Sequence, residues 1–304
     1  MSLATCAAKR DAQPRPIPDE AFDWYDEYAH GLIDRRTFMR RLSGLAVLGF
    51  SMATLTDALL PDYALAEQVS FNDPAIKATY ATFASPKGHN ECQGYLAVPT
   101  QMADSAPVVL VVHENRGLNP YIKDVARRLA MKGFVALAPD ALYPLGGYPG
   151  NDDDGRAMQR SMDRRKLEED FLAAATFLKN HELSNGKLGA VGFCFGGYVV
   201  NMLAATIPEQ LNAGVPFYGT PASPALRAAV TGPLLLQFGS LDKRVNATWS
   251  DYQDVLNAND ADFTAHFYEG AKHGFHNDST GRYSPDDAEL AWSRTLTFFE
   301  QHLA

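Results

Sequence analysis

A cysteine flanked by glycines is the residue in this sequence best placed for covalent chemistry. Residues 192–197, with the sequence GFCFGG, join a short apolar run to a longer apolar segment of helical type. This is the pattern of a nucleophile elbow, a tight strand-to-helix turn, with cysteine in the position of the more usual serine. Small residues let the backbone pass closely through the turn, and the start of a helix favours a thiolate. We therefore predict that Cys194 is a nucleophile rather than a structural thiol.

A cysteine nucleophile works with a base and with a group that orients the base. Asp242 follows the apolar run 234–238, and His273 follows the run 264–268. Each residue alone is a weak signal, because a loop aspartate commonly caps a turn and a loop histidine is commonly just solvated. The chain order of nucleophile, acid and histidine is that of α/β-hydrolases. We therefore predict a catalytic triad of Cys194, His273 and Asp242.

The elements around these residues alternate between strands and helices. The runs 108–112, 134–138, 188–193, 213–218, 234–238 and 264–268 are short and apolar, as strands buried on both faces are. Helices are predicted at 121–132, 163–180, 195–205, 249–259 and 286–302, and an antiparallel hairpin at 78–84 and 94–98. This order predicts an α/β fold, with a mostly parallel central sheet and helices on both faces. We expect one such domain over residues 67–304.

The stretch 139–156 is predicted to be the longest irregular segment of this domain. Its acidic triplet, Asp152 to Asp154, lacks the graded spacing of a calcium-binding loop, so we expect a solvated acidic cluster. His273 and His276 could suggest a metal pair, but no third ligand has suitable spacing. We therefore predict that the protein has no metal site.

From about residue 75 to its end, the chain resembles the dienelactone hydrolase family of the α/β-hydrolase superfamily. The matching segments are HENRG at 113–117, GFCFGG at 192–197, LD at 241–242 and HGF at 273–275. The resemblance implies hydrolysis of a small ester or lactone without a cofactor, and a role for Glu114 in keeping the resting thiol neutral and taking its proton when substrate binds. It also implies an oxyanion hole made by the backbone N–H groups of Phe195 and Asn115. The alternative for Glu114 is a surface salt bridge to Arg116.

The sequence departs from the family next to the catalytic histidine. Members that degrade lactones carry an arginine shortly after this histidine, which holds a substrate carboxylate, and residues 275–278 contain none. Arg156, Arg160 and Arg282 are other candidates for this role, and the sequence does not place them. Two alternatives to hydrolysis therefore stay open, namely a binding protein that has lost catalysis and a thiol redox protein that uses Cys194.

Composition narrows the class of protein and of partner. The 304 residues are 46% hydrophobic and 21% charged, which is ordinary for a soluble enzyme. A formal net charge of −9 argues against nucleic acid as a partner. The three cysteines, Cys6, Cys92 and Cys194, are too few and too scattered for a disulfide framework. We expect a small-molecule ester or lactone as substrate, and the sequence does not determine the oligomeric state.

The N-terminal segment resembles an export signal. Arg35 and Arg36 precede an apolar run over residues 42–55, and Ala64-Leu65-Ala66 has the spacing of small residues that a signal peptidase accepts. The run is too short and too interrupted for a stable membrane span. We predict that residues 1–66 are a twin-arginine-type signal and that the protein is periplasmic or otherwise exported. The alternative is a cytoplasmic protein whose N-terminal helix packs on the domain. Residues 22–33 are predicted to form at best a marginal helix.

Overall fold

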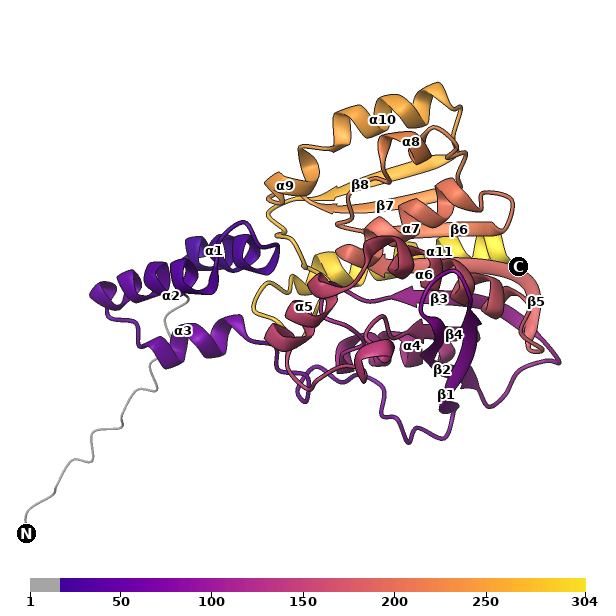
Figure 1. Cartoon of the computed structure of the whole chain (residues 1–304), viewed down its shortest axis with the longest axis horizontal. Coiled ribbons are helices and arrows are strands. Elements are labelled where there is room, and N and C mark those ends of the chain that lie inside the picture. Colours follow the sequence, from indigo (N-terminus) through magenta and orange to yellow (C-terminus); the bar gives the residue numbers. More distant parts are fainter. Residues whose placement is uncertain (1–16) are drawn as a thin grey trace, which may run out of the picture. The chain divides into compact units, whose positions relative to one another are not determined.

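The computed structural model describes residues 17–304, and the chain divides into two compact units between Pro61 and Asp62. The described part of the first unit is helical (Figure 1). Its elements are α1 (Asp19–Ala29), α2 (Arg35–Gly44), the short 3-10 helix η1 (Leu45–Leu48) and α3 (Met52–Leu59). Within residues 17–304, no helix has both the length and the apolar composition that a membrane span requires.

The first unit has a small apolar core of its own. Its buried side chains come from all three α-helices and include Tyr25, Phe38, Leu42, Leu55 and Leu59. Helix α1 begins before the marginal helix predicted at 22–33, and Arg35 and Arg36 form the first turn of α2. How these helices pack does not tell whether an export machinery recognises the segment, so the export signal stays a prediction.

The second unit is built on an eight-stranded sheet with the strand order β1-β2-β4-β3-β5-β6-β7-β8. The strands β1 and β2 form the predicted antiparallel hairpin, β2 pairs antiparallel with β4, and all the other pairs are parallel. The mostly parallel sheet is therefore confirmed. The strands are β1 (Ile76–Ser85), β2 (Asn90–Pro99), β3 (Ala106–Val112), β4 (Val135–Pro139), β5 (Ser184–Phe193), β6 (Leu211–Phe217), β7 (Leu234–Gly239) and β8 (Phe263–Tyr268).

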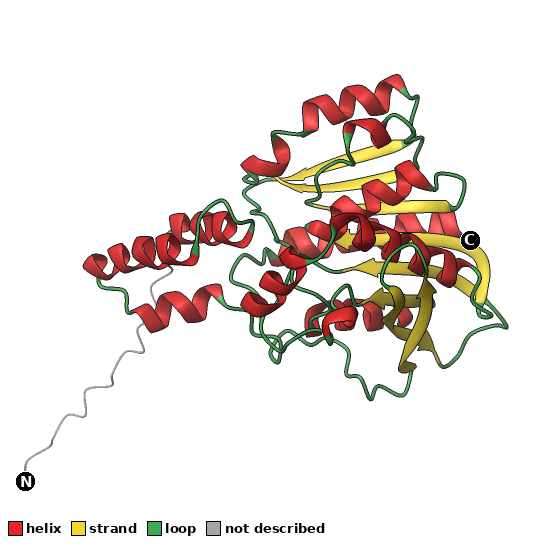
Figure 2. Cartoon of the chain, viewed as in Figure 1, coloured by secondary structure: helices red, strands yellow, loops and turns green. Residues whose placement is uncertain are grey.

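Helices cover both faces of this sheet (Figure 2). Alternate residues of β3 show the two faces, because Leu110 packs in one apolar cluster and Val111 packs in the other. The first cluster includes side chains of α6, α7 and α10, and the second includes side chains of α4 and α11. The helices of this unit are α4 (Pro120–Ala130), α5 (Asp152–Ser161), α6 (Arg164–Lys179), α7 (Phe195–Thr206), α8 (Pro224–Arg227), α9 (Lys243–Asn246), α10 (Trp249–Ala258) and α11 (Pro285–Leu303).

The segment 139–156 differs from the irregular loop that the sequence predicts. It contains a short 3-10 helix, η2 (Tyr143–Leu145), and the start of α5, whose N-cap Asn151 accepts a hydrogen bond from the backbone N–H of Asp154 at 2.9 Å. The acidic triplet forms the first turn of α5, where negative charge is favourable. Asp153 and Asp154 are exposed, but Asp152 is buried against Arg116. The prediction of a solvated cluster was therefore wrong for Asp152.

The turn between β5 and α7 has the close backbone approach expected of a nucleophile elbow. Cys194 lies between the two elements with a φ of 57° and a ψ of −108°, a conformation that costs energy for a residue with a side chain. A Cβ on Gly192 would lie 2.1 Å from the carbonyl oxygen of Gly196. A Cβ on Gly196 would lie 2.1 Å from the carbonyl oxygen of Val112. Only glycine fits at these two positions.

His276 anchors the loop after β8 in the core. Its ring lies 5.2 Å from that of Phe193 and 4.9 Å from that of Phe217, measured between ring centroids. Its Nδ1 is 2.7 Å from the hydroxyl of Tyr121. Burial, helped by the nearby positive charge of Arg128, lowers the pKa of His276 to about 3. The ring is therefore neutral at physiological pH and holds the loop through packing and one hydrogen bond.

We predict that Gly192→Ala destabilises the second unit much more than a change at an open glycine does. The added methyl would collide with the backbone of Gly196, and overpacking of this kind costs about 3 kcal/mol. Gly133 is the control, because it has a φ of +91° and nothing within 4 Å of an added Cβ, so Gly133→Ala should cost about 1 kcal/mol. Urea unfolding of both variants measures the difference, and equal costs would contradict the crowding at the elbow.

We also predict that the free energy of unfolding falls as the pH is lowered, because His276 resists protonation in the folded protein. The unfolded ring takes up a proton near its ordinary pKa of 6.5, whereas the folded ring resists protonation down to about 3. The stabilisation is therefore complete at neutral pH and lost progressively below it, by about 2 kcal/mol between about pH 8 and pH 5. The free energy of unfolding of His276→Gln should be lower at neutral pH but should vary less with pH than that of the wild type. Parallel pH curves would show that His276 does not cause the loss.

Candidate active site

The register of the sheet brings the loops that carry the predicted residues to one edge. Val112 pairs with Gly192 in the parallel pair of β3 and β5, so the loop starting at His113 and the elbow leave the sheet side by side. Gly239 pairs with Tyr268 in the parallel pair of β7 and β8, so the loops of Asp242 and His273 also leave it together. Because all these strands are parallel, their carboxyl ends lie at the same edge, where ligands bind in open α/β sheets.

The predicted nucleophile is located at the centre of this edge. Cys194 is mostly buried, and its backbone N–H donates to the carbonyl of Phe217 at 3.1 Å, which ties the elbow to β6. The Cys194 sulfur lies within 4.8 Å of a ring nitrogen of His273. Helix α7 begins at the next residue, Phe195, so its positive end points toward the sulfur and favours the thiolate.

Asp242 and His273 are in direct contact, and both are buried. The Oδ2 of Asp242 is 2.5 Å from the Nδ1 of His273. The other oxygen, Oδ1, accepts the backbone N–H of Val245 at 3.1 Å and so caps the short helix α9. The cap fixes the carboxylate, and the carboxylate fixes the ring with its proton on Nδ1, which leaves Nε2 as the basic nitrogen. Asp242 therefore both caps α9 and holds the ring of His273.

Glu114 is only 1% exposed, and two groups contact its Oε2. The side-chain amide of Asn277 donates to this oxygen at 3.1 Å, and the Nε of Arg116 lies 3.8 Å from it. The hydroxyl and the backbone N–H of Ser279 both donate to Oδ1 of Asn277, at 2.6 and 3.1 Å, so the amide NH₂ is turned toward Glu114. Glu114 and Arg116 therefore form an ion pair, as the alternative interpretation of Glu114 expects. The pair is buried, however, and does not lie at the surface.

Two residues of this site were missed by sequence reasoning, Asn277 and Tyr218. The only sequence signal for Asn277 is its place shortly after His273. Tyr218 ends β6 with a φ of 38°, and its ring centroid lies 4.9 Å from that of His273. Within residues 17–304, no hydrogen-bond partner faces its buried hydroxyl. Burial raises the pKa of Tyr218 well above its usual range, with further contributions from the charges of Glu114 and Cys194, so the hydroxyl stays a donor.

The structure also places the three arginines that the sequence leaves open. A Cβ on Gly274, the residue after His273, would lie 3.1 Å from the guanidinium carbon of Arg282, and Arg282 is buried. Arg156 is buried on α5 and pairs with Asp153 at 2.9 Å. Arg160 is exposed on the same helix. Arg282 is therefore the arginine of the three that lies against the loop of His273.

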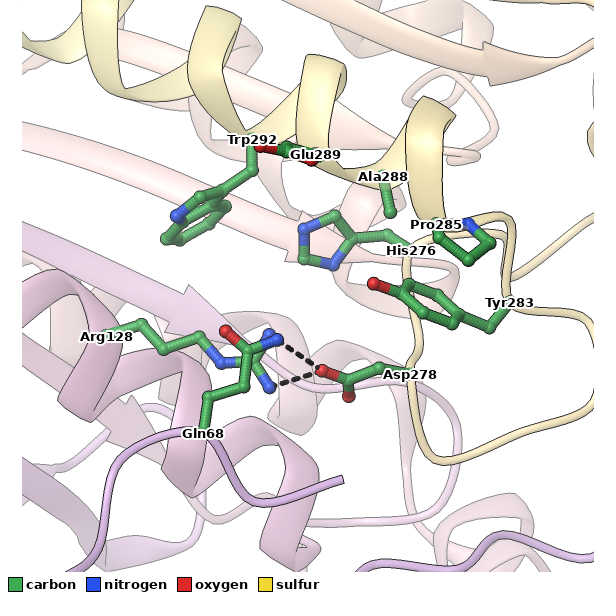
Figure 3. A pocket seen from close by; sticks show the side chains of 9 residues that line it. All are labelled: Gln68, Arg128, His276, Asp278, Tyr283, Pro285, Ala288, Glu289 and Trp292. Carbon is green, nitrogen blue, oxygen red and sulfur yellow. Dashed lines mark hydrogen bonds and ion pairs between the residues drawn. The ribbon is translucent and has the colours of Figure 1, made fainter. Parts of the chain in front are cut away.

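A cavity of about 310 Å³ lies beside this loop, with His276 and Trp292 in its wall (Figure 3). Two of its charged groups pair with each other, since Asp278 accepts from Arg128 at 2.6 Å, and Asp278 also accepts from Gln68 at 2.7 Å. None of the residues that line it belongs to the predicted triad. The cavity is therefore a neighbour of the site and not the space above Cys194.

The backbone donors predicted for the oxyanion come from the two adjacent loops. Phe195 is the first residue of α7, and the first backbone N–H groups of a helix have no acceptor within the helix. Asn115 lies in the loop that follows β3, next to the elbow. The assignment of these two N–H groups to an oxyanion hole stays a prediction.

The protein resembles known hydrolases over most of its length. A family model described as the dienelactone hydrolase family matches residues 92–303, and a second model, described as YqhI-like, matches residues 9–47. The chain is 61% identical over 109 residues to "Putative hydrolase fragment YghX" of Escherichia coli K12, which covers 36% of this chain and 93% of that protein. It is 34% identical over 221 residues to "Putative carboxymethylenebutenolidase" of Aquifex aeolicus, which covers 69% of this chain and 94% of that one.

The fold agrees with these relationships. A crystal structure from Klebsiella pneumoniae, described as "Putative Dienelactone Hydrolase", superposes with a TM-score of 0.64 at 25% identity, over 74% of this chain and 99% of that one. The family model covers more than two thirds of the chain, including Cys194 and His273. The chain is a hydrolase that belongs to the dienelactone hydrolase family.

Proposed function

We propose that the protein hydrolyses a small ester or lactone through Cys194, His273 and Asp242. The observation that carries this proposal is the 2.5 Å contact between buried Asp242 and His273, next to a cysteine at a strained elbow. A carboxylate, an imidazole and a thiol in this order form the arrangement that activates a nucleophile for acyl transfer. The relative named as a carboxymethylenebutenolidase supports a lactone, because a butenolide is an unsaturated lactone.

The reaction proceeds through a thioester. When substrate binds, the Cys194 thiol gives its proton to Glu114 and the thiolate attacks the carbonyl carbon. The backbone N–H groups of Phe195 and Asn115 bind the developing oxyanion. The carbon–oxygen bond breaks, and the leaving oxygen takes the proton that Glu114 had received. Water, deprotonated by Nε2 of His273, then attacks the thioester and releases the acid, and the proton on His273 returns to the sulfur of Cys194.

Arg282 favours a substrate that carries a carboxylate. It lies against Gly274, the residue directly after His273. In lactone-degrading members of the family, the corresponding arginine follows the histidine more closely in the chain. A guanidinium in this position would bind a carboxylate through paired hydrogen bonds. We therefore propose an anionic lactone or ester rather than a neutral one.

The structure gives little support to a thiol redox function. Cys92 lies in the apolar cluster on one face of the sheet, and Cys194 lies in the cluster on the opposite face. Burial, together with the neighbouring Asp170, raises the pKa of the Cys92 thiol to about 12. A protonated thiol on the far side of the sheet is poorly suited to resolve an oxidised Cys194, because the thiolate is the attacking species.

We predict that Cys194→Ala abolishes ester turnover while Cys92→Ala keeps most of it. Loss of the nucleophile should lower kcat at least about 1,000-fold, as for other residues that act as a unit in covalent catalysis. The measurement is steady-state hydrolysis of a dienelactone, of short p-nitrophenyl esters and of a thioester. Circular dichroism should show that both variants are folded. Turnover that survives in Cys194→Ala would exclude the triad.

Export stays a prediction that a matched pair of variants tests. Replacing Arg35 and Arg36 together by lysine should trap the protein in the cytoplasm, because the twin-arginine route reads this pair. The same replacement at Arg40 and Arg41 is the control and should leave export intact. Cell fractionation with an immunoblot measures the distribution. Cytoplasmic recovery of the wild type and of both variants would contradict export.

A further inference from the structure

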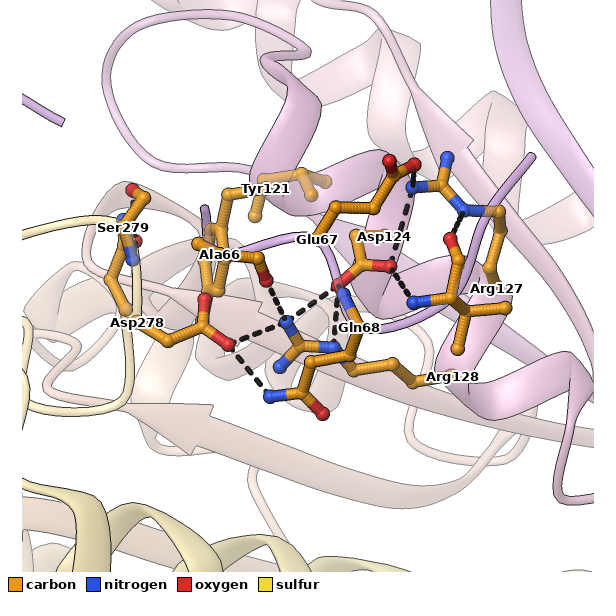
Figure 4. Close-up of polar contacts among 12 residues, drawn as sticks. Ala66, Glu67, Gln68, Tyr121, Asp124, Arg127, Arg128, Asp278 and Ser279 are labelled. Atoms are coloured by element: carbon orange, nitrogen blue, oxygen red, sulfur yellow. Dashed lines mark hydrogen bonds and ion pairs between the residues drawn. The ribbon is translucent and has the colours of Figure 1, made fainter. Parts of the chain in front are cut away.

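A short segment before the family-matched region is anchored on the second unit by buried charged groups. Asp124 on α4 accepts the backbone N–H groups of Gln68 and Val69 at 3.1 and 2.9 Å (Figure 4). The Nε of Arg127 donates to the carbonyl of Val69 at 2.6 Å, and Arg128 donates to that of Ala66 at 3.3 Å. We call residues 62–69 the strap. It lies outside residues 92–303, which match the dienelactone hydrolase model.

The strap residue Tyr63 contacts the first turn of α5 and the N-cap of α4. Its hydroxyl donates to Oδ1 of Asp152 at 2.7 Å and accepts from the side-chain amide of Asn119 at 2.9 Å. Asn119 itself is held as the N-cap of α4, where its Oδ1 accepts from the backbone N–H of Ile122 at 3.2 Å. Burial, together with the charge of Asp152, raises the pKa of Tyr63 far above its usual range, so its hydroxyl is a permanent donor.

Asp152 connects Tyr63 to the predicted proton acceptor. Its Oδ1 accepts a second hydrogen bond, from Tyr148 at 2.9 Å, and its Oδ2 binds the Nη1 of Arg116 at 2.7 Å. The Nε of the same guanidinium lies 3.8 Å from Oε2 of Glu114. Asp152, Arg116 and Glu114 are 6%, 3% and 1% exposed, so water hardly screens these interactions.

One guanidinium is therefore shared between two buried carboxylates. Burial alone would raise the pKa of Asp152, but the charge of Arg116 and the hydrogen bonds from Tyr63 and Tyr148 outweigh it, so the pKa of Asp152 is lowered. An ionised Asp152 fixes the position of Arg116. Without the phenol donors, Asp152 would hold its charge less well, and Arg116 would lose the anchor that keeps its Nε directed at Glu114.

We propose that Tyr63 is a positioning residue for Glu114: its hydroxyl keeps Asp152 in place and ionised, and Asp152 holds Arg116 against Glu114. The proposal rests on the proposed function in one respect, the role of Glu114 as acceptor of the Cys194 proton. It has a direct consequence for the N-terminal segment. Cleavage after Ala66 would remove Tyr63, so the active enzyme keeps the chain intact at this position whether or not it is exported.

The test uses the full-length protein with Tyr63→Phe, which removes only the hydroxyl. Loss of this donor raises the pKa of Asp152, so the acid limb of the kcat/KM profile should move to higher pH. At mildly acidic pH we expect kcat to fall about tenfold, the contribution of one hydrogen bond to a charged group, with little change in KM. Tyr143→Phe is the control, since its hydroxyl contacts the exposed Glu91 at 3.1 Å and should leave the profile unchanged.

A double-mutant cycle tests whether Tyr63 acts through Asp152. Asp152→Asn removes the charge, so adding Tyr63→Phe to it should change kcat and the pH profile no further. Additive effects would mean that Tyr63 acts independently of Asp152 and would overturn the proposal. An acid limb of Tyr63→Phe that coincides with that of the wild type would also overturn it, even if thermal unfolding shows a lower stability.

A measurement without substrate separates this proposal from the proposed function. Alkylation of Cys194 by iodoacetamide, followed by mass spectrometry over a range of pH, reports the ionisation of the thiol alone. Its acid limb should move to higher pH in Tyr63→Phe, because a displaced Arg116 leaves the negative charge of Glu114 less compensated, which disfavours the thiolate form of Cys194. A shifted alkylation profile in a protein without ester turnover would support the network and refute the hydrolase mechanism. An unchanged alkylation profile in an enzyme that hydrolyses esters would refute the network and support the hydrolase mechanism.

Discussion

The close approach of two backbone segments at the elbow constrains the rest of the site. Gly192 and Gly196 let α7 start directly against β5 and next to the end of β3, and the resulting turn forces Cys194 into an unfavourable φ,ψ region. A conformation of this kind persists only where the surrounding structure holds it, and here β3 and β6 do so on either side. The turn places the sulfur within 4.8 Å of a ring nitrogen of His273.

Buried charge is the second constraint, and it extends from the catalytic loops to the strap. Glu114 shares Arg116 with Asp152, which in turn accepts two tyrosine hydroxyls. A buried carboxylate is costly unless hydrogen bonds and an opposite charge compensate it, so each member of this network needs the next one. Tyr63 links the strap to this network, in addition to the contacts of the strap with Asp124, Arg127 and Arg128. A residue outside the family-matched region therefore takes part in the network around Glu114.

The fold and the positions of the reactive residues could be predicted because they depend on local patterns. Short apolar runs alternating with amphipathic helices indicate a buried parallel sheet, and parallel pairing brings the ends of β5, β7 and β8 to one edge. Loops that follow these strands must then converge, which is why Cys194, Asp242 and His273 could be selected from the sequence. The same reasoning failed for Asp152, because a run of acidic residues predicts a solvated loop. Its buried ion pair with Arg116 is not visible in the sequence.

The sequence alone therefore determined the α/β architecture, the family and the candidate triad, since each follows from spacing and residue type along one stretch of chain. Only the tertiary structure decided which side chains complete the site. The contacts of Asn277 with Glu114 and of Tyr63 with Asp152 join residues far apart in the chain, and the contact of Arg282 with Gly274 depends on how one loop folds back on itself. No local periodicity encodes such contacts, because they arise from the way loops pack once the sheet has formed and from the need of buried polar groups for partners.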